Sequence, residues 1–179
     1  DGKYLASPSD DKTIRIWDLS TGECVRVLEG HTEGVFSVAW SPDGKQFASA
    51  SMDNTVRLWN TTTGKSLQTF KEHSGHVYCV AWSPNGSQLA SGGSDKTICI
   101  RNISQGTSQI LKGHTDWISS LLWLPDGNRI LSGSGLIDQT VRLWDIDNGK
   151  MLKAVAENVS TIFCLAWNPD ALTLAMACR

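Results

Sequence analysis

The sequence lacks several features that would assign it to a particular class of protein. Its 179 residues contain no apolar run near the roughly 18 residues needed to cross a bilayer, and no basic-then-apolar leader precedes the first repeated segment. Neither sign of charge dominates, since 16 Lys and Arg face 18 Asp and Glu. Dedicated binders of nucleic acid or of membrane surfaces normally carry a basic stripe, so we expect neither as a direct partner.

Cysteine and histidine are too irregularly spaced to build a disulfide framework or a metal site. The five cysteines are odd in number and share no pairing pattern, which is typical of free thiols in a reducing compartment. No C-x-x-C or H-x₃-H ligand spacing occurs, and no Gly-rich phosphate loop opens a helix. We therefore predict no metal, no cofactor and a cytoplasmic location, with the nucleus as the alternative compartment.

One segment recurs along the chain. A tryptophan followed by a polar residue, with an arginine in place of the tryptophan in one copy, recurs at intervals of 42, 42 and 43 residues. The members of this series are Trp17-Asp18, Trp59-Asn60, Arg101-Asn102 and Trp144-Asp145. A second series is Ala39-Trp40-Ser41-Pro42, Ala81-Trp82-Ser83-Pro84, Leu122-Trp123-Leu124-Pro125 and Ala166-Trp167-Asn168-Pro169. A third is Gly30-His31, Glu72-His73 and Gly113-His114. Recurrence in a fixed order indicates a repeat architecture.

A period of 40 to 45 residues, with Gly-His near the start and Trp-Asp near the end, resembles the WD40 repeat family over the whole chain. The resemblance implies a β-propeller. We predict repeats at 29–70, 71–111 and 112–155, with partial repeats at 1–28 and 156–179, so that residues 1–179 form one partial propeller. Both ends of the chain align with the middle of a repeat, and we expect a fragment of a longer array.

The repeat that begins at Gly30 divides into four short strands, at 35–40, 46–50, 55–59 and 66–70. These runs alternate or are rich in β-branched and aromatic residues, and turn residues such as Asp43-Gly44 separate them. No segment sustains a period of 3.6 residues, so we expect almost no helix. Four such strands cannot bury both faces alone. We predict an all-β fold with about four four-stranded antiparallel blades in an open arc.

Two turns depart from the repeated pattern. The segment 134–138 is two residues longer than its counterpart 51–53, which predicts a protruding loop. Asp170-Ala171 replaces the Asp-Gly or Asn-Gly turn of the earlier units, and Ala tolerates a positive φ poorly.

Each repeat offers a histidine, a serine and an aspartate, which together suggest a catalytic triad. An active site is normally unique in a domain, whereas this set is copied with the repeat, and no G-x-S-x-G elbow presents the serines. The WD40 resemblance implies a structural role instead, as a buried hydrogen-bond chain from Trp through Ser and His to Asp. The residues of these sets are His31, Ser49, Asp53, Trp59, His73, Ser91, Asp95, His114, Ser132, Asp138 and Trp144. Arg101 replaces the tryptophan of the third set, which predicts a more plastic blade. We predict no catalytic residue.

Positions that differ between the copies are freer to serve partners. The WD40 resemblance places the turn after the His and the residue before the Asp on the rim around the central channel. The predicted partner-binding residues are Gly34, Phe36, Met52, His76, Tyr78, Ser94, Trp117, Ser119, Ile137, Thr161 and Phe163, with Asp10 from the first unit. We expect the four aromatic members to be substantially exposed at one end of successive blades. The alternative is that some fold inward against the next blade, since a β-bulge can reverse the direction of a side chain.

These observations favour a non-catalytic scaffold that binds peptides or partner proteins within a multiprotein complex or a larger multidomain chain. A second hypothesis is the sensor or ligand-binding array of a larger signalling NTPase, because the copies are highly regular. A histone-tail or degron reader would need acidic residues around the channel, where only Asp10 and Asp116 stand out. A hydrolase using His31, Ser49 and Asp53 is the remaining alternative.

Overall fold

A computed structural model describes residues 2–168 and 173–179, which form seventeen strands and no helix. None of these residues belongs to a helix that is long and apolar enough to cross a membrane. The predicted turn at Asp170-Ala171 lies outside the described residues.

The strands form five antiparallel sheets in chain order. The first has three strands: β1 (Tyr4–Pro8), β2 (Ile14–Asp18) and β3 (Cys24–Leu28). The second contains β4 (Val35–Trp40), β5 (Gln46–Ser51), β6 (Val56–Asn60) and β7 (Ser66–Phe70). The third contains β8 (Val77–Trp82), β9 (Gln88–Gly93), β10 (Thr97–Asn102) and β11 (Ser108–Lys112). The fourth contains β12 (Ile118–Trp123), β13 (Arg129–Ser134), β14 (Val141–Asp145) and β15 (Lys150–Ala156). The last is the hairpin β16 (Ile162–Asn168) and β17 (Thr173–Cys178).

Each four-stranded sheet is a meander, because every strand is joined to the next by a short turn. The first turn of each carries a glycine with a positive φ: Gly44 at 69°, Gly86 at 71° and Gly127 at 73°. This conformation is nearly free of strain for glycine, so these turns can be tight. The turns fix the register, in which Phe47 faces Trp59 across β5 and β6.

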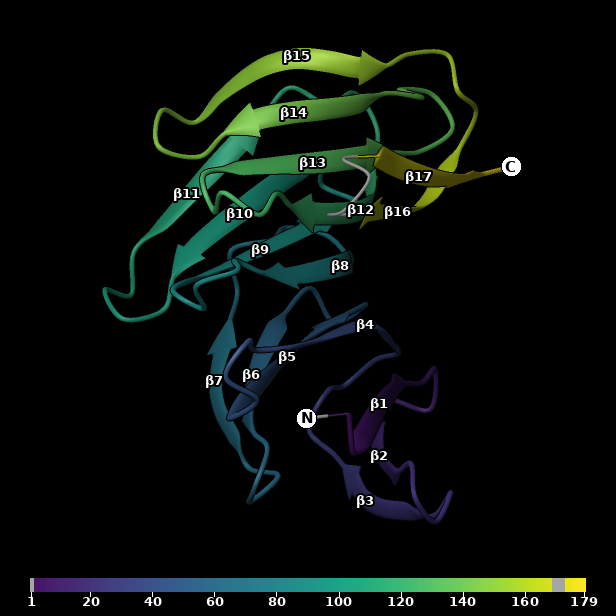
Figure 1. Cartoon of the computed structure of the whole chain (residues 1–179), viewed down its shortest axis with the longest axis vertical. Helices are drawn as coiled ribbons and strands as arrows, with labels where there is room; N and C mark the ends of the chain where they lie inside the picture. Colours follow the sequence, from purple (N-terminus) through teal and green to yellow (C-terminus); the bar gives the residue numbers. More distant parts are fainter. Residues whose placement is uncertain (1, 169–172) are drawn as a thin grey trace.

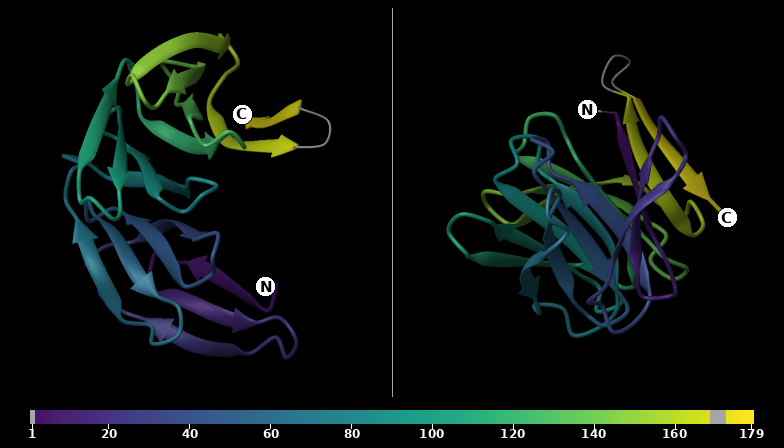
Figure 2. Two further views of the ribbon diagram at one scale, coloured as in Figure 1. Left: turned by 60° about the vertical axis from the view of Figure 1, so that its left-hand side comes forward. Right: turned by 90° about the horizontal axis from the view of Figure 1, so that it is seen from below.

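The sheets stack side by side into a curved, open arc (Figure 1), with the two ends of the chain on the open side (Figure 2). The first strands of successive sheets, β4, β8, β12 and β16, contact one another in that order and form the inner edge. In the part of the chain that the structure describes, β16 pairs with β17 alone, and β1 to β3 form a separate sheet. The predicted all-β open arc is therefore confirmed.

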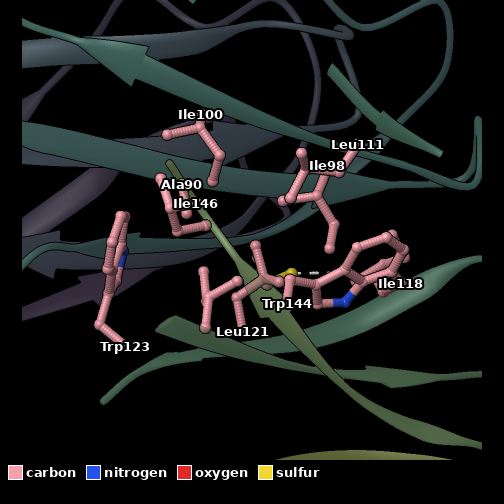
Figure 3. Packing of buried hydrophobic residues seen from close by; sticks show 11 residues of the cluster. Ala90, Ile98, Ile100, Leu111, Ile118, Leu121, Trp123, Trp144 and Ile146 are labelled. Carbon is pink, nitrogen blue, oxygen red and sulfur yellow. Dashed lines mark hydrogen bonds between the residues drawn. The ribbon is translucent and has the colours of Figure 1, made fainter. Parts of the chain in front are cut away.

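Apolar side chains fill the space between neighbouring sheets. The layer between the third and fourth sheets contains Ile98, Ile100, Leu111, Ile118 and Trp144 (Figure 3), all nearly inaccessible to water. Burial of apolar surface contributes about 25 cal/mol per Å² to the stability of the folded chain. Because each blade buries its apolar faces against the adjacent blades, a blade is stable only when its neighbours are present.

Hydrogen bonds also join adjacent sheets along the inner edge. The indole N–H of Trp82 donates to the Ala39 carbonyl at 3.0 Å, and that of Trp123 donates to the Ala81 carbonyl at 3.1 Å. The repeated Ala-Trp pair in the sequence therefore fixes the spacing of the inner strands, which positions the ends of these strands next to one another.

Candidate interaction rim and the buried polar networks behind it

In the second sheet, a chain of hydrogen bonds connects four side chains from distant parts of the repeat. The Trp59 indole donates to Ser49 Oγ at 2.8 Å. Ser49 Oγ lies 2.6 Å from His31 Nε2, and His31 Nδ1 lies 2.8 Å from Asp53 Oδ2. The Asp53 carboxylate also accepts the Thr32 amide at 3.1 Å. This network ties the loop before β4 to the turn between β5 and β6.

The fourth sheet repeats this arrangement. The Trp144 indole donates to Ser132 Oγ at 2.8 Å, Ser132 Oγ is 2.6 Å from His114 Nε2, and His114 Nδ1 is 3.1 Å from Asp138 Oδ2. Arg142 reaches the same carboxylate at 3.3 Å from its Nη2 and donates from Nη1 to the Gly113 carbonyl at 2.6 Å.

The third sheet keeps only part of the chain. His73 lies 2.8 Å from Ser91 Oγ and 2.9 Å from Asp95 Oδ2. Arg101 occupies the tryptophan position and forms an ion pair with Glu72, while its guanidinium carbon lies 4.4 Å from the centre of the Phe70 ring. The loss of the indole is thus accompanied by a new ion pair and a cation–π contact.

The first sheet has a shorter network of two side chains, which the sequence patterns did not reveal. The Trp17 indole donates to Ser7 Oγ at 2.8 Å. The spacing of the two residues could have predicted this hydrogen bond, because Ser7 precedes Trp17 by ten residues, as Ser49 precedes Trp59.

The surroundings of His31 and His114 favour the neutral imidazole, and those of Asp53 favour the charged carboxylate. Burial lowers the pKa of His31 and His114 below the ordinary value, although the neighbouring aspartates oppose this. Burial alone would raise the pKa of Asp53, but hydrogen bonds from Thr55 and His31 outweigh it and lower the pKa to about 2. A neutral His31 can then donate from Nδ1 to Asp53 and accept at Nε2 from Ser49, so every member has a partner.

This geometry leaves the serines unsuited to nucleophilic attack. Ser49 and Ser132 are fully buried, and each hydroxyl already contacts both an indole and an imidazole. A nucleophile needs an approach path for the substrate. Among the residues that the structure describes, no group of three or more His, Cys, Asp or Glu could hold a metal ion.

The inner strands share a local irregularity near the rim. Each of β4, β8, β12 and β16 carries a β-bulge just after its first residue, where the register shifts by one. The bulged residues, which pair with nothing across the strand, are Phe36, Tyr78, Ser119 and Phe163. A bulge releases its extra residue from the ladder and redirects its side chain. All four had been assigned to the rim from the sequence.

Three aromatic rings form a continuous row across three blades. The Phe36 and Tyr78 rings are 5.1 Å apart, and the Tyr78 and Trp117 rings are 5.3 Å apart, both in edge-to-face geometry. Such pairs stabilise one another beyond their burial by about 0.5–1.5 kcal/mol. The expected exposure holds for Phe36, at 41%, and for Phe163, at 56%.

The expected exposure of the other two aromatic side chains is wrong. Tyr78 is half-buried between Phe36 and Trp117. Trp117 is also half-buried, with its indole packed against Gly135 and its Nε1 buried without a hydrogen-bond partner. The edge-to-face packing of the row and the fold of the inserted loop account for this difference.

Two other rim residues offer no surface to a partner. Gly34 is buried beside Asp10 and Met52, and Thr161 is 2% exposed. Ser119 is half-buried, and its hydroxyl donates to the Ile162 carbonyl, which joins the fourth and last sheets. These positions hold the rim together.

The inserted segment forms a well-anchored loop beside Trp117. The Asp116 carboxylate accepts the Trp117 amide with one oxygen and the Ile137 amide with the other, both at 2.9 Å. The Gly135 amide donates to the Trp117 carbonyl at 3.0 Å. Ile137 itself projects into solvent, at 79% exposed, with Leu136 beside it. The predicted protruding loop is therefore confirmed.

His76 connects Met52 of the second blade to Ser94 of its own blade. His76 Nδ1 lies 2.7 Å from the Met52 carbonyl, and the His76 carbonyl accepts the Ser94 amide at 2.8 Å. The exposed face that we call the interaction rim thus consists of Phe36, Met52, His76, Tyr78, Ser94, Trp117, Ile137 and Phe163.

Repeated four-stranded meanders stacked around an inner edge define a propeller-type repeat protein. The family model for the WD40 domain, "WD domain, G-beta repeat", matches residues 1–18, 22–60, 64–102 and 106–145. These matches cover more than half of the sequence, and the chain belongs to the WD40 family.

Single repeats of the chain are similar to repeats in much longer proteins. It is 57% identical over 42 residues to the nuclear distribution protein PAC1 of Coccidioides posadasii (strain C735), which is 24% of this chain and 9% of that protein. Over 42 residues it is 57% identical to a ribosome biogenesis protein BOP1 homolog of Monosiga brevicollis and 50% identical to that of Drosophila virilis. Each of these two matches covers 24% of this chain and 5% of the relative. WD40 repeats generally mediate protein–protein interaction.

Proposed function

We propose that this chain is a non-catalytic scaffold that binds peptides or partner proteins through the interaction rim. The observation that carries the proposal is the row of Phe36, Tyr78 and Trp117, in edge-to-face contact at the inner end of adjacent blades. Aromatic side chains supply much of the energy of protein interfaces, and a row of them on a stiff framework is already ordered before a partner arrives. Phe163 and Ile137 extend the apolar surface beyond the row.

The partner class in this proposal is protein, with no direct contact to nucleic acid or membrane and no cofactor. The formal net charge of −2 and a rim built from residues other than Asp, Glu, Lys and Arg support it. Five free cysteines support a cytoplasmic location, with the nucleus as the second compartment. The scaffold would act inside a multiprotein complex or as part of a larger multidomain chain.

The test selects peptides on the purified chain from a random phage library and measures the affinity of the chosen synthetic peptide by calorimetry. Phe36→Ala and Phe163→Ala should each weaken binding by about 2 kcal/mol or more, because both rings are exposed and the fold does not need them. Leu67→Ala is the matched control, since Leu67 is similarly exposed on β7, away from the rim. Unchanged affinity in both phenylalanine variants, with the fold intact, would refute the proposal.

Trp117→Ala is a less direct test than the phenylalanine variants. Its indole packs on Gly135, so removing it loosens the inserted loop as well as the aromatic row. We expect a loss of affinity together with a lower melting temperature, measured by circular dichroism. Ile137→Ser separates the two effects, because its side chain projects into solvent and packs on nothing that the fold requires.

A sensor or ligand-binding array of a larger signalling NTPase remains the alternative. The regular intervals of 42, 42 and 43 residues favour it, and a G-x₄-G-K-[ST] motif in the full reading frame would decide for it. The reader of histone tails or degrons has less support, because both oxygens of Asp116 already accept backbone amides. A serine-directed fluorophosphonate should leave Ser49 unlabelled, since that hydroxyl is buried; labelling would favour the hydrolase.

A further inference from the structure

Two Asn-Gly pairs lie in turns of the sheets, apart from the interaction rim. Asn85-Gly86 joins β8 to β9, and Asn148-Gly149 joins β14 to β15. Both asparagine side chains are exposed. Asparagine is thermolabile, because the amide nitrogen of the next residue can attack its side-chain carbonyl carbon. Glycine has no side chain to obstruct this attack, so the two pairs share the same chemistry and differ in their folded surroundings.

Hydrogen bonds hold both partners of the first pair. The Gly86 amide, which would be the nucleophile, donates to the Ser83 carbonyl at 2.9 Å. Asn85 Oδ1 accepts from the amide and the hydroxyl of Ser87, at 3.0 and 2.7 Å, and from Ser83 Oγ at 2.8 Å. Attack at Asn85 would therefore break the hydrogen bond of the nucleophile and turn the side chain away from three donors.

The second pair lacks these restraints. In the corresponding turns of the first three sheets, the glycine amide donates to the carbonyl four residues earlier, from Gly22 to Asp18, from Gly64 to Asn60 and from Gly106 to Asn102. The turn of the fourth sheet closes at Lys150 instead, which pairs with Asp145 in the ladder. In the part of the chain that the structure describes, neither the Gly149 amide nor Asn148 Oδ1 makes a hydrogen bond.

A carboxylate lies beside the nitrogen that would leave. Asp145 Oδ2 accepts from Asn148 Nδ2 at 2.9 Å, and Asp145 Oδ1 accepts from the Asn148 amide at 3.1 Å. These hydrogen bonds lower the pKa of Asp145, so the group is charged at neutral pH. Because the departing nitrogen gains protons as it leaves, a neighbouring negative charge favours its departure.

We infer that Asn148 is a site of spontaneous deamidation, with water as the co-reactant, and that the fold protects Asn85. The Gly149 nitrogen forms a bond to Asn148 Cγ, the Cγ–Nδ2 bond breaks, and ammonia leaves with the Gly149 amide proton. Water then opens the cyclic imide to aspartate or isoaspartate. The product carries a carboxylate where Nδ2 had donated to Asp145, so two like charges face each other and the turn before β15 loosens.

The test incubates the intact chain at neutral pH and follows two tryptic peptides by mass spectrometry. The peptide 143–150 contains Asn148, the peptide 72–96 contains Asn85, and neither contains another asparagine. Deamidation adds about 1 Da. The peptide with Asn148 should gain this mass about fivefold faster or more, because attack at Asn85 must first break the hydrogen bond of Gly86.

The matched control is the same chain unfolded in guanidinium chloride, where both pairs lose their surroundings and should react at similar rates. Equal rates in the folded chain, or a faster gain at Asn85, would overturn the inference. Asn148→Gln should abolish the gain in the peptide 143–150, since the longer side chain does not form the five-membered imide readily. A gain that persists in this variant would show that the modified residue is not Asn148.

The effect on the turn has its own test. Hydrogen exchange of the Lys150 and Met151 amides should be faster in Asn148→Asp than in the unmodified chain. Asn85→Asp is the control and should leave its turn unchanged, because aspartate already fills that position in the second sheet, where Asp43 Oδ1 accepts from Ser41 Oγ and the Lys45 amide. Unchanged exchange in Asn148→Asp would overturn the predicted loosening.

Discussion

The second and third blades have the same strand order, yet they are held together at their edges by different chemistry. In the second, Trp59 lies over Gly30, and a Cβ at Gly30 would come within 3.2 Å of the indole. In the third, the tryptophan is Arg101 and the glycine is Glu72, and the two form an ion pair. Gly30 has a φ of 149°, a conformation that side chains rarely adopt, whereas Glu72 has no positive φ. The replacements of tryptophan by Arg101 and of glycine by Glu72 therefore belong together, because the absence of the indole makes room for the Glu72 carboxylate.

The largest difference between the blades should appear when these central side chains are truncated. Trp59→Ala removes a side chain that is 2% exposed and takes a donor from Ser49, so we expect a loss of about 3–5 kcal/mol in unfolding free energy. Arg101→Ala removes a partly exposed ion pair and should cost about 1–2 kcal/mol. Urea denaturation of both variants measures this. Equal losses would mean that the ion pair replaces the indole in full.

Removal of the histidines tests the networks one step further from the tryptophan. His31→Ala should destabilise by roughly 1–3 kcal/mol, because Ser49 and Asp53 lose a partner in a buried site. His73→Ala should cost less, because its network already lacks the indole. Denaturant melts of the two variants provide the comparison. An equal or greater loss in the His73 variant would contradict the role that we assign to the tryptophan.

At the carboxylate end of the network, the two blades should behave alike. Asp53 and Asp95 both have a pKa of about 2, below the ordinary 3.8, because hydrogen bonds from His and Thr outweigh the opposing effect of burial. Since the folded pKa is the lower one, each contributes stability that is present above about pH 4 and is lost as the pH falls towards 2. We expect about 1–2 kcal/mol for each carboxylate. Thermal melts from pH 5 to 2 should show a slope that Asp53→Asn and Asp95→Asn reduce equally.

The smallest expected effect is the coupling between Glu72 and Arg101. Both side chains are about four-fifths buried, at 17% and 19% exposed, so their coupling should exceed that of a surface pair and reach about 1 kcal/mol. A double-mutant cycle of Glu72→Ala, Arg101→Ala and the double variant measures it. Additive losses would show that the ion pair contributes nothing to the stability of the third blade.

The fold could be predicted closely because its signals are local. The strand expected at 35–40 is β4 and the one expected at 66–70 is β7, while β5 is one residue longer than expected and β6 is shifted by one residue. The tetrad residues could be located because the repeat copies them. Their hydrogen bonds, however, came from the family resemblance, since spacing alone does not show which polar atoms meet.

Some features depend on two residues that lie far apart in the sequence and that each depart from the repeat, and these features could not be predicted. Glu72 and Arg101 each stood out as an exception in the sequence, but only the folded sheet brings them into contact. The exposure predicted for Trp117 rests on its place at the rim, but the inserted loop brings Gly135 against its indole.

The bulge at the start of each inner strand has a consequence for how such an array diverges after its repeats are duplicated. Phe36, Tyr78, Ser119 and Phe163 stand outside the ladder, so an exchange of the residue there disturbs no cross-strand partner. Every copy therefore brings one position that selection can change without disturbing the ladder, and the cost to folding is lowest at Phe36 and Phe163, because Ser119 joins two sheets and Tyr78 is half-buried. A combinatorial library confined to the codons of Phe36 and Phe163 would vary the inner surface of the arc while the sheets beneath it stayed the same.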